Sequence, residues 1–276
     1  MSTAPLMQAM FLVIGKRMAV IRSVLITIAC AFLLSACVTT TTGGFNTEPS
    51  AERAERDFVQ LAIGYYEAGD MGAARRNINN ALALNSRSSA AYNVLALVLQ
   101  REGDGQLARD TFLRALELDA KNSRARNNYA ALLFDIGEFE QSYRQLEIVA
   151  NDTTYESRDL AFQNLGLSAQ RTDRPERAEY AFERALQLNS NALRSLLELA
   201  QIKFDKGEFA VAMNYYSRFV TSSQFMNVVQ TPRSLLLGIQ LERRFDNEEG
   251  AAVYAVLLER MYADSPEYRQ YLNLSQ

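Results

Sequence analysis

The sequence contains no histidine, no tryptophan and only two cysteines among its 276 residues. Histidine is the usual general base at neutral pH, a partner in Ser-His and Cys-His pairs, and the commonest metal ligand. The chain also lacks a Gly-x-x-x-x-Gly-Lys phosphate loop and a Gly-x-Gly-x-x-Gly segment after a strand. We therefore expect no enzyme, no cofactor and no catalytic or metal-binding residue. Acidic pairs such as Glu138/Glu140 are most simply solvating charge, with a carboxylate enzyme as the remote alternative.

Lysine is scarce after residue 36: the only lysines there are Lys121, Lys203 and Lys206, and arginine supplies the other basic residues. Residues 1–36 hold three of the 29 basic residues and none of the 32 acidic ones, so the net charge of the remainder is 26 − 32, or −6. An acidic chain without a basic stripe is a poor nucleic-acid binder. We expect neither a nucleic-acid partner nor a small-molecule substrate.

Residues 1–36 have the layout of an export signal. Lys16, Arg17 and Arg22 precede an apolar run from Val24 to Leu34, and small residues follow it. The run is too short for a spanning helix, which needs about 20 apolar residues. Met18 would give a more ordinary signal than Met1, and the sequence leaves the true start open.

Leu34-Ser35-Ala36-Cys37 resembles the bacterial lipoprotein signal-peptide box. That resemblance implies lipidation of Cys37, with diacylglycerol on the thiol and an acyl chain on the new amino group. The alternative is an ordinary cleavage site with a coincidental cysteine. Three acyl chains would anchor the protein stably. Val38 stands where an aspartate commonly retains lipoproteins in the inner membrane, so the resemblance favours the outer membrane, facing the periplasm.

Residues 37–50 are expected to form the acylated end and a flexible tether, because they show no apolar period. From residue 51 onward an apolar pattern recurs. Its clearest copy spans Ser89–Asn122, with Tyr92, Leu95 and Leu99 on one helical face and Phe112 on a second helix. This is the 34-residue tetratricopeptide pattern of helix, tight turn and helix.

Five further copies keep nearly the same register, offset by 34, 34, 36, 34 and 38 residues. The first copy places Leu61 and Tyr65 in the positions that Leu95 and Leu99 occupy in the second. One hairpin cannot bury its own apolar face, whereas stacked hairpins can. We therefore predict an all-α, right-handed superhelical solenoid over residues 51–276. Its six units are expected at about 55–88, 89–122, 123–158, 159–192, 193–230 and 231–265.

Three segments depart from the regular repeat. Residues 151–156 and 222–231 lengthen two loops, either as tolerated insertions or as places where the superhelix changes pitch or meets a partner. The tail that begins at Pro266 is predicted to be a helix that caps the open end of the solenoid. Its aromatic side chains could instead form a contact.

The tetratricopeptide resemblance implies that the first helix of each pair lines a concave groove. Val59 and Ile63 stand where chaperone-binding members carry the lysine and asparagine of a carboxylate clamp, which argues against such a clamp. A hydrophobic strand or helix laid in the groove fits better. The predicted protein-binding residues are Val59, Ile63, Tyr66, Asn93, Leu97, Gln100, Arg101, Asn127, Ala131 and Phe134.

The lipoprotein box, the tether and the six repeats together resemble the type IV pilus biogenesis lipoproteins, the PilF/PilW pilotin family. Further matches are Ala51-Glu52-Arg53-Ala54, Leu61-Ala62-x-Gly64-Tyr65-Tyr66 and Asn127-Asn128-Tyr129-Ala130-x-Leu132-Leu133. The cysteine pair of some members is missing here. The resemblance implies a partner, the secretin subunit, whose localisation and multimerisation in the outer membrane the protein would promote, supporting pilus-dependent motility. The alternative is a periplasmic repeat lipoprotein that scaffolds barrel-assembly or cell-wall machinery.

Overall fold

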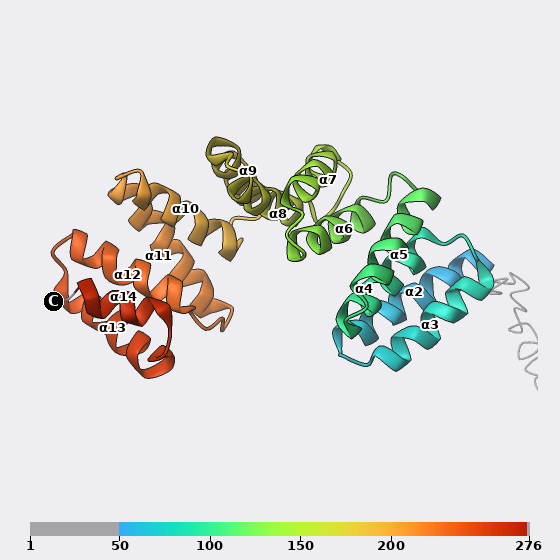
Figure 1. The fold of residues 1–276 in the computed structure, drawn as a ribbon, viewed down its shortest axis with the longest axis horizontal. Coiled ribbons are helices and arrows are strands. Elements are labelled where there is room, and N and C mark those ends of the chain that lie inside the picture. Colours follow the sequence, from blue (N-terminus) through green and yellow to red (C-terminus); the bar gives the residue numbers. More distant parts are fainter. Residues whose placement is uncertain (1–49, 275–276) are drawn as a thin grey trace, which may run out of the picture. The chain divides into compact units, whose positions relative to one another are not determined.

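The computed structural model describes residues 50–274, and all secondary structure in that range is helical (Figure 1). The helices α2 to α13 form six antiparallel pairs, and α14 follows them. The first helices of the pairs are α2 (Ala51–Glu67), α4 (Ser89–Glu102), α6 (Ser123–Asp135), α8 (Arg158–Arg171), α10 (Leu193–Asp205) and α12 (Pro232–Arg244). The second helices are α3 (Met71–Leu84), α5 (Gly105–Leu118), α7 (Phe139–Asn151), α9 (Pro175–Leu188), α11 (Phe209–Phe225) and α13 (Glu248–Tyr262).

The predicted all-α solenoid of six hairpins with a capping helix is confirmed. The helix α14 (Pro266–Leu274) packs on α12 and α13, where Tyr268 and Tyr271 contact the last apolar cluster. The predicted signal peptide and the predicted tether up to residue 49 lie outside the described residues.

Helix ends follow from local side chains. Ser50, Asp70, Ser88 and Asn122 each accept a hydrogen bond from the backbone N–H three residues later, which satisfies a donor that the helix leaves unpaired. Proline occupies the first helical position of α9 and α12, where its fixed φ suits the helix and no N–H is needed.

One turn geometry recurs between the two helices of every unit. A single residue there has a positive φ, and we call it the turn residue of its unit. A left-handed backbone favours glycine, with aspartate tolerated at some cost. The turn residues are Gly69, Gly103, Gly137, Asp173, Gly207 and Asp246.

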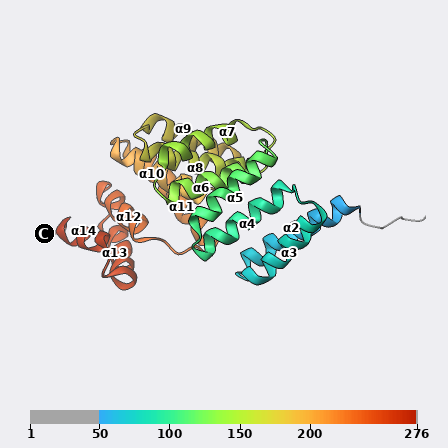
Figure 2. The ribbon, with the colours of Figure 1, turned by 45° about the vertical axis from the view of Figure 1, so that its right-hand side comes forward.

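The core forms where paired helices touch and where each unit meets the next. Large buried side chains such as Phe112, Phe182 and Tyr216 project from the second helices against small residues of the first helices. Extensive contacts join only helices of the same unit or of neighbouring units, as the succession of pairs in Figures 1 and 2 illustrates. Stability is therefore distributed along the stack.

Candidate protein-binding groove

Three predicted groove residues lie in the first unit and contact the second. Val59 is buried against Ala91 and Val94 of the next unit, while Ile63 is half-buried beside it. Tyr66 is half-buried beneath Arg101, whose guanidinium carbon lies 4.0 Å from the ring centroid. Arg101 also donates a 2.6 Å hydrogen bond from Nη1 to the Tyr66 carbonyl. The exposed Arg101 thus ties two units together.

The predicted asparagines form a ladder between successive first helices. Asn93 is 2% exposed and accepts a 2.9 Å hydrogen bond from the Nδ2 of Asn128. Asn127, also buried, accepts one of 3.2 Å from the Nδ2 of Asn164. Val59, Asn93 and Asn127 all stand ten residues before their turn residue, a position that faces the following unit. Their side chains therefore pack between units and do not line open surface.

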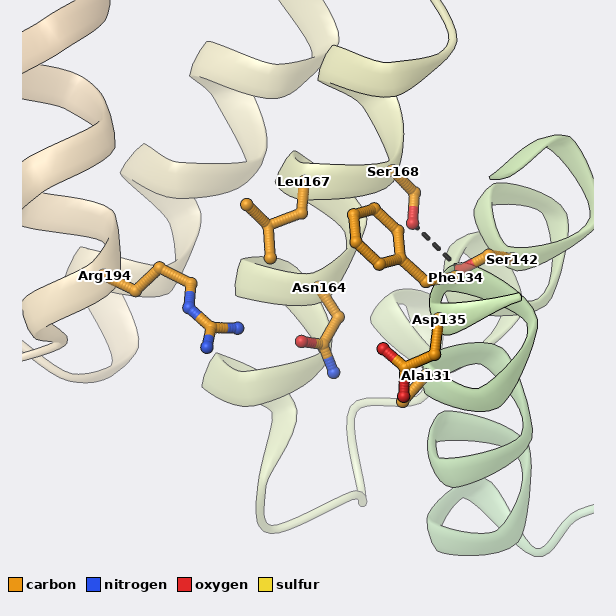
Figure 3. Close-up of a pocket in the computed structure, with 8 residues that line it drawn as sticks. All are labelled: Ala131, Phe134, Asp135, Ser142, Asn164, Leu167, Ser168 and Arg194. Carbon is orange, nitrogen blue, oxygen red and sulfur yellow. Dashed lines mark hydrogen bonds between the residues drawn. The ribbon is translucent and has the colours of Figure 1, made fainter. Parts of the chain in front are cut away.

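The other predicted residues keep accessible surface. Leu97 is half-buried against the Phe112 cluster, and Gln100 donates a 3.1 Å hydrogen bond to Asp135. Ala131 and Phe134, on α6, line a hollow of about 230 Å³ that the first helices of three units share (Figure 3).

The lining of the hollow is partly apolar, and the two ends carry opposite charges (Figure 3). Phe134 and Leu167 supply the apolar surface. Asp135 lies at one end, and Arg194 reaches in from α10 at the other. No hydrogen bond or ion pair joins the side chain of Arg194 to another residue in the described range, so its guanidinium remains available.

The back wall of the hollow is fixed by buried hydroxyls. Ser142 and Ser168 lie 2.9 Å apart with fully buried side chains, and Ser142 donates to the Ala130 carbonyl. Asn164 donates one of its amide N–H groups to Asn127, and its carbonyl oxygen faces the hollow (Figure 3). A peptide bound here would find an acceptor at Asn164, a donor at Arg194 and an apolar surface between them.

A stack of aromatic rings and arginine supports the Phe134 side of the hollow. The rings of Phe134 and Phe139 meet edge to face at 5.0 Å, and Arg171 covers Phe139 at 4.0 Å. The arrangement recurs two units later, where Arg244 covers Phe209 at 4.2 Å. Such contacts hold the rings in one orientation.

Sequence reasoning missed Asp135, Asn164, Leu167 and Arg194. Leu167 stands six residues before its turn residue, as do Ile63, Leu97 and Ala131 in the first three units. Extending the same position by one repeat would have found Leu167. No periodic signal marks Arg194 as a residue that reaches into a hollow.

A second apolar surface lies on α2, around Leu61 and Tyr65. The equivalents of Leu61 in the third to fifth units, Tyr129, Leu165 and Leu199, are buried because a preceding unit covers them. No described unit precedes α2, and Leu61 is 50% exposed. The first unit therefore shows to solvent an apolar face that later units bury.

Residues 50–274 hold neither a cluster of metal-ligand side chains nor a membrane-spanning helix. Within that range no three acidic, cysteine or histidine side chains come together as metal ligands would. Over the same range, no helix is both long enough and apolar enough to cross a membrane.

The fold and the hollow together define a class of protein. It is a helical repeat scaffold with an accessible hollow that suits a segment of another protein. The tetratricopeptide repeat model matches residues 59–123 and 164–227. Repeat scaffolds of this kind bind other proteins and are not enzymes.

The particular family follows from the relatives. The type IV pilus assembly protein PilF of Pseudomonas aeruginosa is 32% identical over 248 residues, which is 88% of this chain and 96% of PilF. The chain belongs to this PilF family, and the homology supports a role in type IV pilus biogenesis.

Solved structures agree with this assignment. A structure of Pseudomonas aeruginosa PilF matches with a TM-score of 0.76 and 33% identity, covering 81% of this chain and 98% of that one. PilW, described as a widely conserved type IV pilus biogenesis factor, matches in fold with a TM-score of 0.66 and 23% identity, covering 80% and 99%.

Proposed function

We propose that this protein is a pilotin: an outer-membrane lipoprotein, anchored through Cys37, that binds the type IV pilus secretin subunit and promotes its localisation and multimerisation. The observation that carries the binding half is the hollow between Phe134 and Arg194, together with membership of a pilus assembly family. An apolar segment seated there would be kept from pairing with other subunits too early. The lipid anchor would give the complex its destination.

The binding half is tested by affinity capture of the tagged protein from detergent-solubilised envelopes, followed by mass spectrometry. We expect the secretin to be recovered with the unmodified chain and lost with Phe134→Glu or Arg194→Glu. Arg194 is exposed and has no partner among the described residues, so its substitution should leave the fold intact. Leu97→Glu tests the second unit of the same groove.

A matched control is Ile148→Glu, on the exposed face of α7, where Ile148 is 53% exposed. It introduces the same charge on a second helix and should retain capture. Leu61→Glu tests whether the secretin binds to the apolar face of α2 and not to the hollow. Loss of secretin only with Leu61→Glu would move the binding surface to α2. Recovery of barrel-assembly or cell-wall proteins without secretin would replace the pilotin role with the scaffold alternative.

The proposed role of the lipid anchor is tested by Cys37→Ala. We expect the variant to leave the outer-membrane fraction and secretin multimers to fall there. Normal secretin multimers in the outer membrane of such cells would refute the escort mechanism.

A further inference from the structure

The outer face of α13, in the last unit, carries a cluster of exposed apolar side chains. Val253, Val256, Leu257 and Met261 are each between 37% and 59% exposed. Figures 1 and 2 both show α13 at the edge of the carboxyl-terminal units, where it packs against α12 and α14. A surface helix normally turns its polar side toward solvent. An exposed apolar face of this kind is typical of a site that contacts another molecule.

The apolar pair Val253 and Val256 has no counterpart at the same repeat positions of the earlier units. Val253 and Val256 stand seven and ten residues after the turn residue Asp246. The same two positions in the five earlier units hold Arg76 and Asn79, Asp110 and Leu113, Arg144 and Glu147, Tyr180 and Glu183, and Asn214 and Ser217. Only α13 has an apolar residue at both.

Two unpaired charges flank the apolar pair on the same line of the helix. Glu249, Val253, Val256 and Arg260 are spaced by four, three and four residues, which places them in one row that we call the α13 ridge. Glu249 and Arg260 are exposed, and no hydrogen bond or ion pair joins the side chain of either to another described residue. Eleven residues separate them, or about 16 Å along the axis, too far to pair within one helix.

We propose that the α13 ridge is a self-association surface and that its occupant is the α13 ridge of a second copy, packed antiparallel. A two-fold axis between residues 254 and 255 places Val253 opposite Val256 of the other copy. The same axis places Glu249 opposite Arg260, twice. Parallel packing would set like charges together, so the order of charges selects the antiparallel arrangement.

The proposed contact surface is small for a protein–protein interface. The helix has 15 residues, and one helix pair buries less than the roughly 1,200 Å² of a standard interface. An interface of that size is typical of weak, transient association. This step rests on the lipid anchor of the proposed function. Two copies anchored in one membrane would meet more often than free ones, so a weak contact is enough to form dimers there.

The test is sedimentation velocity of the full chain in a non-ionic detergent over a concentration series. We expect concentration-dependent dimers for the unmodified protein. Glu249→Arg and Arg260→Glu should each weaken association by about tenfold or more, because each sets two pairs of like charges face to face. The double variant with both substitutions restores opposite charges and should return to within about threefold of the original.

A matched control is Glu176→Arg, the residue three positions after the turn residue in the fourth unit, as Glu249 is in the sixth. It should leave association unchanged. Circular dichroism verifies that every variant is folded. A monomer throughout the series, dimers insensitive to both single substitutions, or a double variant as weak as the singles would each overturn the proposal.

Discussion

At the scale of single residues, the repeat depends on how closely two helices can approach. The residue seven positions before the turn residue touches the partner helix, and in the fourth unit it is Gly166. A Cβ on Gly166 would lie 2.6 Å from the ring of Phe182, which is fully buried and cannot move aside. The equivalent residues in the first, second, third and fifth units are Ala62, Ala96, Ala130 and Ala200, whereas the sixth unit has Ile239 at this position.

Gly166→Ala should therefore lower the free energy of unfolding by about 1–3 kcal/mol, because the core must expand to admit the methyl group. Gly64→Ala is the matched control, since a Cβ at Gly64 meets nothing within 4 Å. That variant should gain about 0.4–1 kcal/mol from the less flexible unfolded chain. Urea denaturation followed by circular dichroism compares the two, and equal midpoints would contradict the packing argument.

A buried hydroxyl at Ser195 gives a second expectation at this scale. Ser195 is fully buried and its Oγ has no hydrogen-bond partner. Alanine stands at the same position in the second, third and fourth units, as Ala91, Ala125 and Ala161. Ser195→Ala removes a desolvated hydroxyl without leaving a large cavity, so it should raise stability by about 1 kcal/mol. A lower denaturation midpoint for this variant would show that the hydroxyl has a partner in solution.

At the scale of helices, ion pairs join α9 to α10. Glu179 of α9 meets the Nζ of Lys203 at 2.7 Å and that of Lys206 at 2.5 Å. Burial acts to raise the pKa of Glu179, but the hydrogen bonds from the two lysines outweigh it and hold the pKa below its ordinary value of 4.5. The same contacts raise the pKa of Lys203.

Because the pKa of Glu179 is lower in the folded state, its contribution to stability is present above pH 4.5 and is lost as the pH falls through the folded value. The unmodified protein should lose unfolding free energy in this acidic range. Glu179→Gln should be less stable at neutral pH and show a shallower loss on acidification. Denaturation midpoints measured between neutral pH and the acidic range test this, and parallel pH profiles would exclude the contribution.

At the scale of the whole described solenoid, contacts between neighbouring units make stability local. The last unit is tied to the fifth by Arg233 of α12, which donates two hydrogen bonds, of 2.6 and 2.9 Å, to the buried carboxylate of Glu198 on α10. The hydrogen bonds to Glu198 raise the pKa of Arg233 against the effect of burial. Removing one partner would leave an uncompensated buried charge.

Arg233→Met should therefore speed backbone hydrogen exchange in α12, α13 and α14 while leaving α2 to α5 unchanged. Hydrogen–deuterium exchange with mass spectrometry measures both regions in one sample. Exchange that accelerates equally in all units would show that the solenoid unfolds as one cooperative body and would contradict the nearest-neighbour description.

Much of the fold could be predicted because residues close together in the sequence determine each helical hairpin. Apolar spacing and small contact residues define the hairpins, and glycines mark four of the six turns. The candidate site could be predicted only in part. Phe134 and Ala131 line the hollow, whereas Asn93 and Asn127, predicted from the same helical spacing, lie buried in a ladder. Helical phase alone does not distinguish a groove from the contact with the next unit.

The sequence by itself determined the all-helical class, the number of hairpins and the absence of histidine chemistry, because these depend on composition and on spacing within one repeat. Only the tertiary structure decided which apolar residues are covered. Leu61 is exposed while Leu165 is buried at the same repeat position, since α2 has no described unit before it. Arg194 reaches the hollow from a helix two units after Phe134. Exposure depends on which neighbour covers a face, and a periodic pattern does not carry that information.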